Sequence, residues 1–152
     1  MALDVKLLKK LRDATAASIA DCKKALEESN GDYDKALEWL KKHGIAKAAK
    51  KEGRETSQGI IDAYIHGGGK VGVLTELTCE TDFVARTEDF KKLAHELGMQ
   101  VAAMNPKDVD ALLKQEYIRD PKLTMEEVVK QVIGTLGENI KVKRFTRFEI
   151  GE

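Results

Sequence analysis

Apolar side chains recur every three or four positions in the first part of the chain, which is the spacing of an amphipathic helix. They fall into three blocks: Val5, Leu8 and Leu11; Ile19, Cys22 and Leu26; and Tyr33, Leu37 and Leu40. Ser18 and Asp32 stand near the starts of the second and third blocks, where N-caps are expected, and Gly44 follows as a residue able to end a helix. We expect a three-helix module over residues 1–44.

Polar and basic residues dominate the next stretch, residues 45–57. Its cations have the spacing i, i+3, i+4 and i+7: Lys47, Lys50, Lys51 and Arg54. A helix would gather them on one face, which could contact phosphates, but a solvated linker has the same composition. The pattern favours a basic linker, followed by a second domain over residues 58–152.

Alternation of apolar and polar positions replaces the helical spacing at the start of the second domain. Residues 60–66 place Ile61 and Ile65 on one face, as expected for a half-buried strand, and residues 71–79 (VGVLTELTC) form a second run. Between them lie three glycines at positions 67–69, which are typical of a tight turn. The loop joins two strands, so it lacks the strand–loop–helix context of a phosphate-binding loop. We expect a plain hairpin.

Helical spacing returns in the C-terminal half. It predicts a long helix from Thr87 to Met104, a weaker one over residues 108–118, and a third that starts with a capping box formed by Thr124 and Glu127. Residues 139–150 then alternate as a strand, except that Phe145 falls out of step, which indicates either a bulge or burial on both faces. The fold class is therefore α+β: a three-helix module, a linker helix, and a core of about three antiparallel strands packed with helices.

Composition excludes several classes of function. The 152 residues include 26 basic and 26 acidic side chains, so no overall field attracts the protein to nucleic acid or to a membrane. Cys22 and Cys79 lie far apart in the sequence and have no metal-ligand spacing, and the three histidines are scattered. No apolar run has the length of a signal peptide or a membrane span. We expect a cytoplasmic protein with no metal, no cofactor and no catalytic residues.

The stretch CETDFVAR, residues 79–86, has two interpretations that the spacing leaves open. In one, Thr81 caps a helix whose first turn favours acidic residues, and Phe83 and Val84 pack back onto the sheet. In the other, a tight bend exposes Asp82 and Phe83 together as a rigid projection that inserts into a partner.

Three separated segments resemble one family, in the order in which that family has them. They are LRDATAASIADCKKALEESNGDYDKALEWL at residues 11–40, TDFVAR at residues 81–86 and GENIKVKRFTRFEIGE at residues 137–152. The family is elongation factor Ts, whose members carry a small ubiquitin-associated-like module before an α+β core. The resemblance covers nearly the whole chain except residues 107–123, where related proteins usually have a longer insertion.

The resemblance implies a guanine nucleotide exchange factor of protein synthesis, not an enzyme. Its partner would be elongation factor Tu, in the GDP-bound and nucleotide-free forms. The loop of Thr81, Asp82, Phe83 and Val84 would push into the partner's nucleotide-binding domain and disturb the magnesium ion that helps to hold GDP. The N-terminal module would dock on the same domain, and by position its contact residues are Arg12, Ile19, Ala20 and Lys23.

Two further expectations follow from the resemblance. Longer members contain two core halves and this chain has length for one, so we expect a homodimer. The competing class is a binding module for RNA or the ribosome that lacks exchange activity and uses the basic linker and the terminal strand. In that strand Lys141, Lys143, Arg144 and Arg147 are interleaved with Phe145 and Phe148. The neutral overall charge argues against direct nucleic-acid binding.

Overall fold

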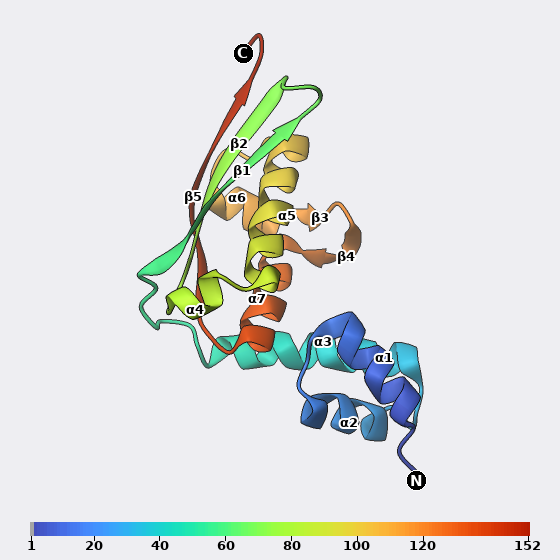
Figure 1. The fold of residues 1–152 in the computed structure, drawn as a ribbon. Helices are drawn as coiled ribbons and strands as arrows, with labels where there is room; N and C mark the ends of the chain where they lie inside the picture. Colours follow the sequence, from blue (N-terminus) through green and yellow to red (C-terminus); the bar gives the residue numbers. More distant parts are fainter. Residues whose placement is uncertain (1) are drawn as a thin grey trace.

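The computed structural model describes residues 2–152, and within them the chain folds into an α+β arrangement (Figure 1). Three helices form the N-terminal part: α1 (Val5–Thr15), α2 (Ile19–Glu28) and α3 (Tyr33–Ala49). The remaining elements are β1 (Gln58–His66), β2 (Val71–Cys79), α4 (Asp82–Ala85), α5 (Glu88–Met104), α6 (Val109–Lys114), β3 (Glu116–Tyr117), β4 (Asp120–Thr124), α7 (Met125–Leu136) and β5 (Ile140–Glu149). The predicted fold class is confirmed.

The N-terminal helices form a small bundle with its own core. Its buried residues are Leu11, Cys22, Ala25, Leu26, Ala36 and Leu40. The predicted caps are in place, because Ser18 Oγ accepts a hydrogen bond from Asp21 N at 3.0 Å and Asp32 Oδ1 accepts one from Lys35 N at 3.0 Å. Each cap satisfies a backbone donor that a helix start leaves without a partner.

The third helix does not end at Gly44, as the sequence suggested, but continues to Ala49. Gly44 lies where α3 crosses α7, opposite Gly134. A Cβ atom added at Gly134 would come within 2.6 Å of the Cα atom of Gly44, so the two backbones meet without side chains between them. Gly44 therefore serves close helix packing instead of a left-handed stop.

Because α3 is longer than predicted, the cations of residues 45–57 lie partly on the helix and partly beyond it. Lys47 lies on α3 and pairs with Asp21 at 2.6 Å, whereas Arg54 lies beyond the helix and is 3.6 Å from Glu80. A single basic helix face, the alternative to a basic linker, does not form, because α3 ends at Ala49 before the pattern of four cations is complete.

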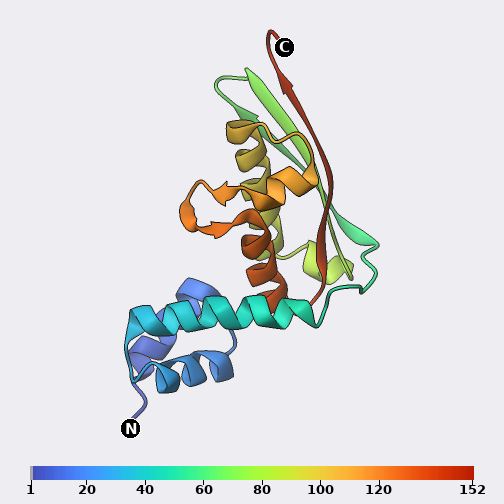
Figure 2. The same cartoon turned by 180° about the vertical axis from the view of Figure 1, so that it is seen from behind.

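The main sheet has the strand order β1-β2-β5 and is antiparallel throughout. The hairpin prediction is confirmed: Lys70 N donates to His66 O at 3.1 Å, and all three glycines between them have positive φ. Figures 1 and 2 show α5 and α7 on one side of the sheet, while no helix of the described part, residues 2–152, covers the other side.

The predicted orientation of β1 is wrong. Ile61 and Ile65 are each 65% exposed, and the alternate residues Asp62 and Tyr64 face α5 instead. The reason lies in α5, where Gly98 lets the tyrosine approach: a Cβ added at Gly98 would be 3.1 Å from Tyr64 Cβ. The packing of Tyr64 against this glycine therefore determines which face of β1 is buried, and the isoleucines are left on the exposed face.

Of the two explanations for the position of Phe145, the structure shows the bulge. Leu77 pairs with Val142 and Glu76 with Arg144, so Lys143 is the extra residue. The bulge returns Phe145 to the core side of the sheet and leaves Phe148 on the open side, 72% exposed.

Residues 108–118 are only partly helical. Helix α6 ends at Lys114, because Gln115 is extended and Met125 N donates to its carbonyl at 2.9 Å. The small β3–β4 hairpin that follows is attached to α5 through Glu96 Oε2, which accepts hydrogen bonds from Tyr117 Oη at 2.7 Å and Arg119 Nε at 2.6 Å. The hairpin, held by this nearly buried carboxylate, takes the place of the second half of the predicted helix.

Helix α5 lies at the centre of the second core. Its buried residues Phe90, Leu93, Ala94, Leu97 and Val101 form one cluster with residues of β2 and α7. The α7 capping box is confirmed, since Thr124 and Glu127 exchange hydrogen bonds. Across residues 2–152, no helix combines the length and apolar character needed to span a membrane.

Candidate functional site: an exposed bend after the second strand

The bend at residues 79–86 combines features of both interpretations. Thr81 caps α4, a single helical turn, and its hydroxyl accepts a hydrogen bond from Val84 N at 3.4 Å. Val84 packs against the core, as the helix-start interpretation requires, and Ala85 is buried there as well. Phe83 does not pack back onto the sheet: it is 79% exposed. The bend is thus a capped helix start that presents an aromatic ring to solvent.

Asp82 lies beside Phe83 on the solvent side. Its carboxylate is half-exposed and accepts a hydrogen bond from Arg86 Nη2 at 2.7 Å, four residues further on. An exposed pair at this spacing contributes only about 0.2–0.5 kcal/mol. The carboxylate is therefore readily available to a partner.

Thr81 is fixed at three atoms. Glu138, in the loop between α7 and β5, accepts hydrogen bonds from Thr81 N at 2.9 Å and from Thr81 Oγ1 at 2.7 Å. The thiol of Cys79 donates to Thr81 O at 3.1 Å. Burial, and then the nearby Glu138 carboxylate, raise the pKa of Cys79 to about 11, so this thiol stays protonated at neutral pH.

A second carboxylate bridge joins the same two segments, but here the carboxylate comes from the bend and the backbone amide from the loop between α7 and β5. Glu80 Oε1 accepts a hydrogen bond from Asn139 N at 2.8 Å, and the Asn139 side chain donates to Arg54 O at 2.7 Å. Asn139 is buried. Three segments that are far apart in the sequence therefore meet at the base of the bend.

The four candidate docking residues lie on the N-terminal bundle, and all are exposed. Ile19, Ala20 and Lys23 lie on α2, where spacings of three and four residues place them on a common side of the helix. Arg12 lies in the last turn of α1. Burial raises the pKa of the Cys22 thiol on α2, and the Arg12 guanidinium partly offsets this, which indicates that Arg12 is near α2.

The docking residues and the bend do not form one continuous site. In Figure 1, α1 and α2 lie at one end of α3 and α4 lies beyond the other end. Helix α2 runs along α3 as far as its second half, where Asp21 contacts His43 and Lys47. The structure thus offers two separate exposed surfaces.

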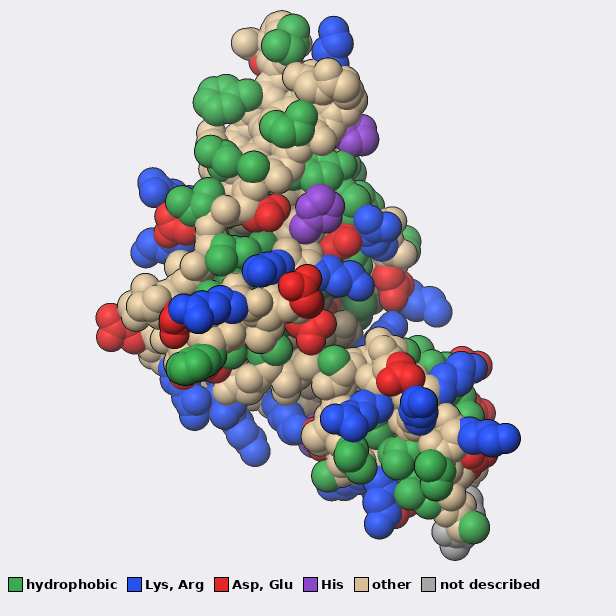
Figure 3. All heavy atoms as spheres, in the orientation of Figure 1, with side chains coloured by type: hydrophobic (Ala, Val, Ile, Leu, Met, Phe, Trp, Pro, Cys, Tyr) green, Lys and Arg blue, Asp and Glu red, His purple; other side chains and the backbone are tan. Residues whose placement is uncertain are grey.

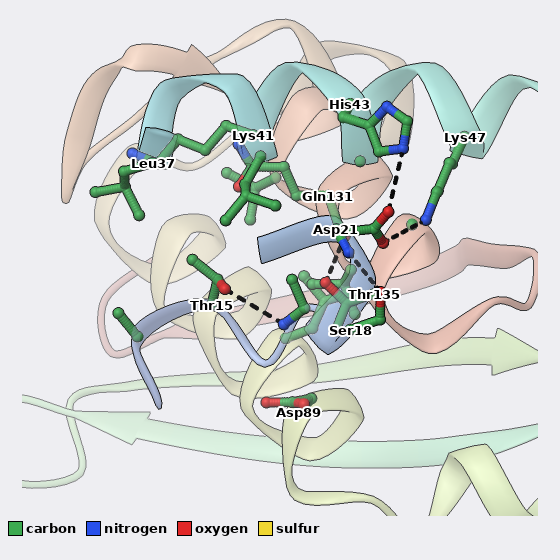
Figure 4. A pocket seen from close by; sticks show the side chains of 18 of the residues that line it. Thr15, Ser18, Asp21, Leu37, Lys41, His43, Lys47, Asp89, Gln131 and Thr135 are labelled. Atoms are coloured by element: carbon green, nitrogen blue, oxygen red, sulfur yellow. Dashed lines mark hydrogen bonds and ion pairs between the residues drawn. The ribbon is translucent and has the colours of Figure 1, made fainter. Parts of the chain in front are cut away.

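A cavity of about 550 Å³ lies between the N-terminal bundle and the core (Figure 4). At its edge Asp21 accepts a hydrogen bond from Lys47 and lies 3.6 Å from His43. Burial acts to raise the pKa of Asp21, but the Lys47 hydrogen bond and the neighbouring positive charges lower it overall. These contacts fix α2 against α3.

Charges of both signs are interspersed over the viewed surface in Figure 3. Several cations from the basic stretches are paired with acids, including Lys47 with Asp21 and Arg144 with Glu76 at 3.0 Å. Within residues 2–152 no group of three or more potential metal ligands occurs. Both cysteines are buried and unpaired with each other.

Sequence reasoning missed Glu138, Glu80 and Asn139 as supports of the bend. The only signal was indirect: Gly137, a residue type that can end a helix, is followed at once by an acid and an amide in GEN. Side chains that satisfy backbone groups of another segment leave no periodic pattern.

Comparison with known proteins gives consistent matches. The family model described as elongation factor TS matches residues 80–152. Among curated relatives, elongation factor Ts of Rippkaea orientalis is 41% identical over 196 positions, covering 99% of this chain and 79% of the relative. That of Fervidobacterium nodosum is 40% identical over 197 positions and covers both chains completely. That of Nitratidesulfovibrio vulgaris is 41% identical over 196 positions, covering 99% and 98%.

These matches define the class of the protein as a translation elongation factor. More specifically, the chain belongs to the elongation factor Ts family. The aligned 197 positions exceed the 152 residues of this chain, so the Fervidobacterium relative carries residues without a counterpart here.

Proposed function

We propose that this protein is a guanine nucleotide exchange factor that binds elongation factor Tu in its GDP-bound and nucleotide-free forms and promotes GDP release. Membership of the family supports the partner and the reaction. The observation that carries the proposal is the bend itself: Phe83 is 79% exposed on a turn whose capping residue is held at three atoms. A large exposed ring on a fixed backbone is suited to insertion into another protein.

The proposed mechanism requires no bond chemistry. Phe83 enters the partner's nucleotide-binding domain, and the adjacent Asp82 carboxylate disturbs the magnesium and phosphate site. A magnesium ion bound to phosphates supplies much of the local charge compensation, so disturbing its surroundings weakens the hold on GDP. Coupling is reciprocal: if the factor lowers the affinity for nucleotide, incoming nucleotide lowers the affinity for the factor by the same ratio.

The N-terminal module, residues 1–44, is proposed to dock on the same domain of the partner. Ile19 is 53% exposed and contributes an apolar contact, while Lys23 and Arg12 provide charge beside it. Ala20 adds only a small contact area. Ion pairs such as Lys47 with Asp21 occupy cations that an RNA-binding module would need, which favours the exchange factor over that alternative.

We also propose that two copies associate through the open side of the main sheet. Exposed apolar residues gather there: Ile61, Ile65, Leu74 and Phe148, with Ile150 just beyond β5. Ile65 and Phe148 both pair with Gly72, so they flank a position without a side chain. An apolar face of this kind, repeated on a second copy, supports a two-fold interface.

The exchange activity is tested by the release of fluorescent GDP from elongation factor Tu in excess unlabelled GDP. We expect the wild-type protein to accelerate release and Phe83→Ala to reduce the acceleration by about 10- to 160-fold. That range corresponds to the roughly 1.5–3 kcal/mol gained when a phenylalanine side chain is buried. No acceleration by the wild-type protein would refute the proposed function.

The dimer is tested by light scattering at micromolar concentration. We expect the mass of two chains for the wild-type protein and of one chain for Leu74→Glu, because a carboxylate would be buried in an apolar interface. The control is Lys141→Glu, a charge change on β5 of the same sheet but outside the group of exposed apolar residues. A wild-type mass of one chain would exclude the dimer.

A further inference from the structure

We propose that Glu138 is a positioning residue for exchange: it sets the direction in which the bend presents Phe83. The inference rests on the proposed exchange function and goes beyond it, because Glu138 lies outside the loop and belongs to another segment of the chain. Its two carboxylate oxygens accept separate hydrogen bonds from Thr81 N and Thr81 Oγ1.

Helix α4 cannot hold its own position. It has only four residues, and a helix this short is unstable without outside contacts. Its direction therefore depends on contacts with the rest of the protein, and Thr81, which directly precedes the turn, makes several of them. The Thr81 hydroxyl donates to Glu138, which leaves its lone pairs free to accept from Val84 N. Glu138 thus orients the cap as well as the backbone.

Glu138 is itself held in place. Gly137 ends α7 with φ +76, and its amide donates to Ile133 O at 2.8 Å. On the other side, Asn139 is fixed by Glu80 and by the carbonyl of Arg54. The carboxylate is therefore presented by a rigid segment, and its contacts with Thr81 transmit that rigidity to the bend.

The chain contains a matched control for this contact. At the start of α7, Glu127 Oε1 accepts hydrogen bonds from Thr124 N at 3.0 Å and Thr124 Oγ1 at 3.2 Å. The chemistry is the same, a glutamate accepting from the amide and hydroxyl of a capping threonine. The site lies at the opposite end of α7 from Glu138, so its loss removes a cap without touching the bend.

The experiment compares Glu138→Ala and Glu127→Ala in the GDP-release assay over a range of factor concentrations. We expect Glu138→Ala to lower the maximal release rate by about tenfold, the effect of losing about 1.4 kcal/mol. The concentration at half-maximal rate should change by less than about twofold, because docking through the N-terminal module is separate from the bend. Glu127→Ala should keep the wild-type maximal rate.

A double-mutant cycle with Phe83→Ala separates positioning from a direct role. If Glu138 acts through the bend, Glu138→Ala adds little to a protein that already lacks the ring. Glu138→Gln, which keeps one acceptor for Thr81 N, should give an intermediate rate, and it carries the test if Glu138→Ala does not fold.

Several outcomes would overturn the inference. These are a wild-type maximal rate for Glu138→Ala, an equal loss for Glu127→Ala, or independent effects of Glu138→Ala and Phe83→Ala. Each is distinct from failure of the proposed function, in which the wild-type protein itself would not accelerate release.

Discussion

Two threonines in this protein cap helices with the help of a glutamate, and the two sites differ in where the glutamate comes from. Thr124 uses Glu127, three residues away, and the result is a local start for α7. Thr81 uses Glu138, which is distant in sequence, and the result joins two segments beneath an exposed aromatic ring. The same chemistry serves helix formation in one place and the placement of a surface side chain in the other.

The strongest test of this difference replaces each threonine with valine, which keeps the shape and removes the hydroxyl. Both changes should lower the free energy of unfolding by about 0.5–2 kcal/mol, the usual effect of losing an N-cap. Only Thr81→Val should also slow GDP release, by about tenfold if the loss equals roughly 1.4 kcal/mol. Urea unfolding and the release assay measure the two effects, and equal release rates for both variants would remove the functional distinction.

A smaller effect is expected from pH, because only the Thr81 site includes a thiol. Burial and Glu138 raise the pKa of Cys79 to about 11 from an ordinary 9.0. Since the unfolded chain loses this proton first, the thiol's contribution to stability is complete below pH 9 and is lost as pH rises toward 11.

The measurement is the free energy of unfolding at pH 8 and pH 10. We expect the wild-type protein to lose about 1 kcal/mol more than Cys79→Ala over this interval. Groups elsewhere, including Tyr117, whose pKa is also raised by burial and by Glu96, contribute equally to both proteins. Equal losses of unfolding free energy in the wild-type protein and Cys79→Ala would show that the pKa of Cys79 is not raised in the folded state.

The smallest effect concerns Arg86, which pairs with Asp82 on the surface of the bend. Because the pair is exposed, Arg86→Ala should change the free energy of unfolding by less than about 0.5 kcal/mol. GDP release should stay within about twofold of wild type if Glu138, and not this pair, fixes the bend. A tenfold decrease in release would transfer the positioning role to Arg86.

The same contrast explains what the sequence could and could not predict. The caps of Ser18, Asp32 and the Thr124–Glu127 box act over three residues, so their spacing in the sequence was sufficient to predict them. Gly44 was misread as a helix end because its partner, Gly134, is ninety positions away.

The prediction of which face of β1 is buried was wrong for a related reason. Tyr64 faces inward only because α5 has a glycine at position 98. At the bend, the capping role of Thr81 was predicted, whereas the exposure of Phe83 depends on the surrounding packing. Periodicity reports which neighbours a residue has along its own element, but not which distant backbone it meets.

The contact between Gly44 and Gly134 has a consequence for recognition. With no side chain between the two backbones, α3 packs closely on α7, which fixes the N-terminal bundle that carries Ile19 relative to the core that carries Phe83. A partner that touches both residues at once must present its own two sites at the same spacing. Under the proposed exchange function, a partner is recognised by the spacing of its two binding sites as well as by their surface chemistry.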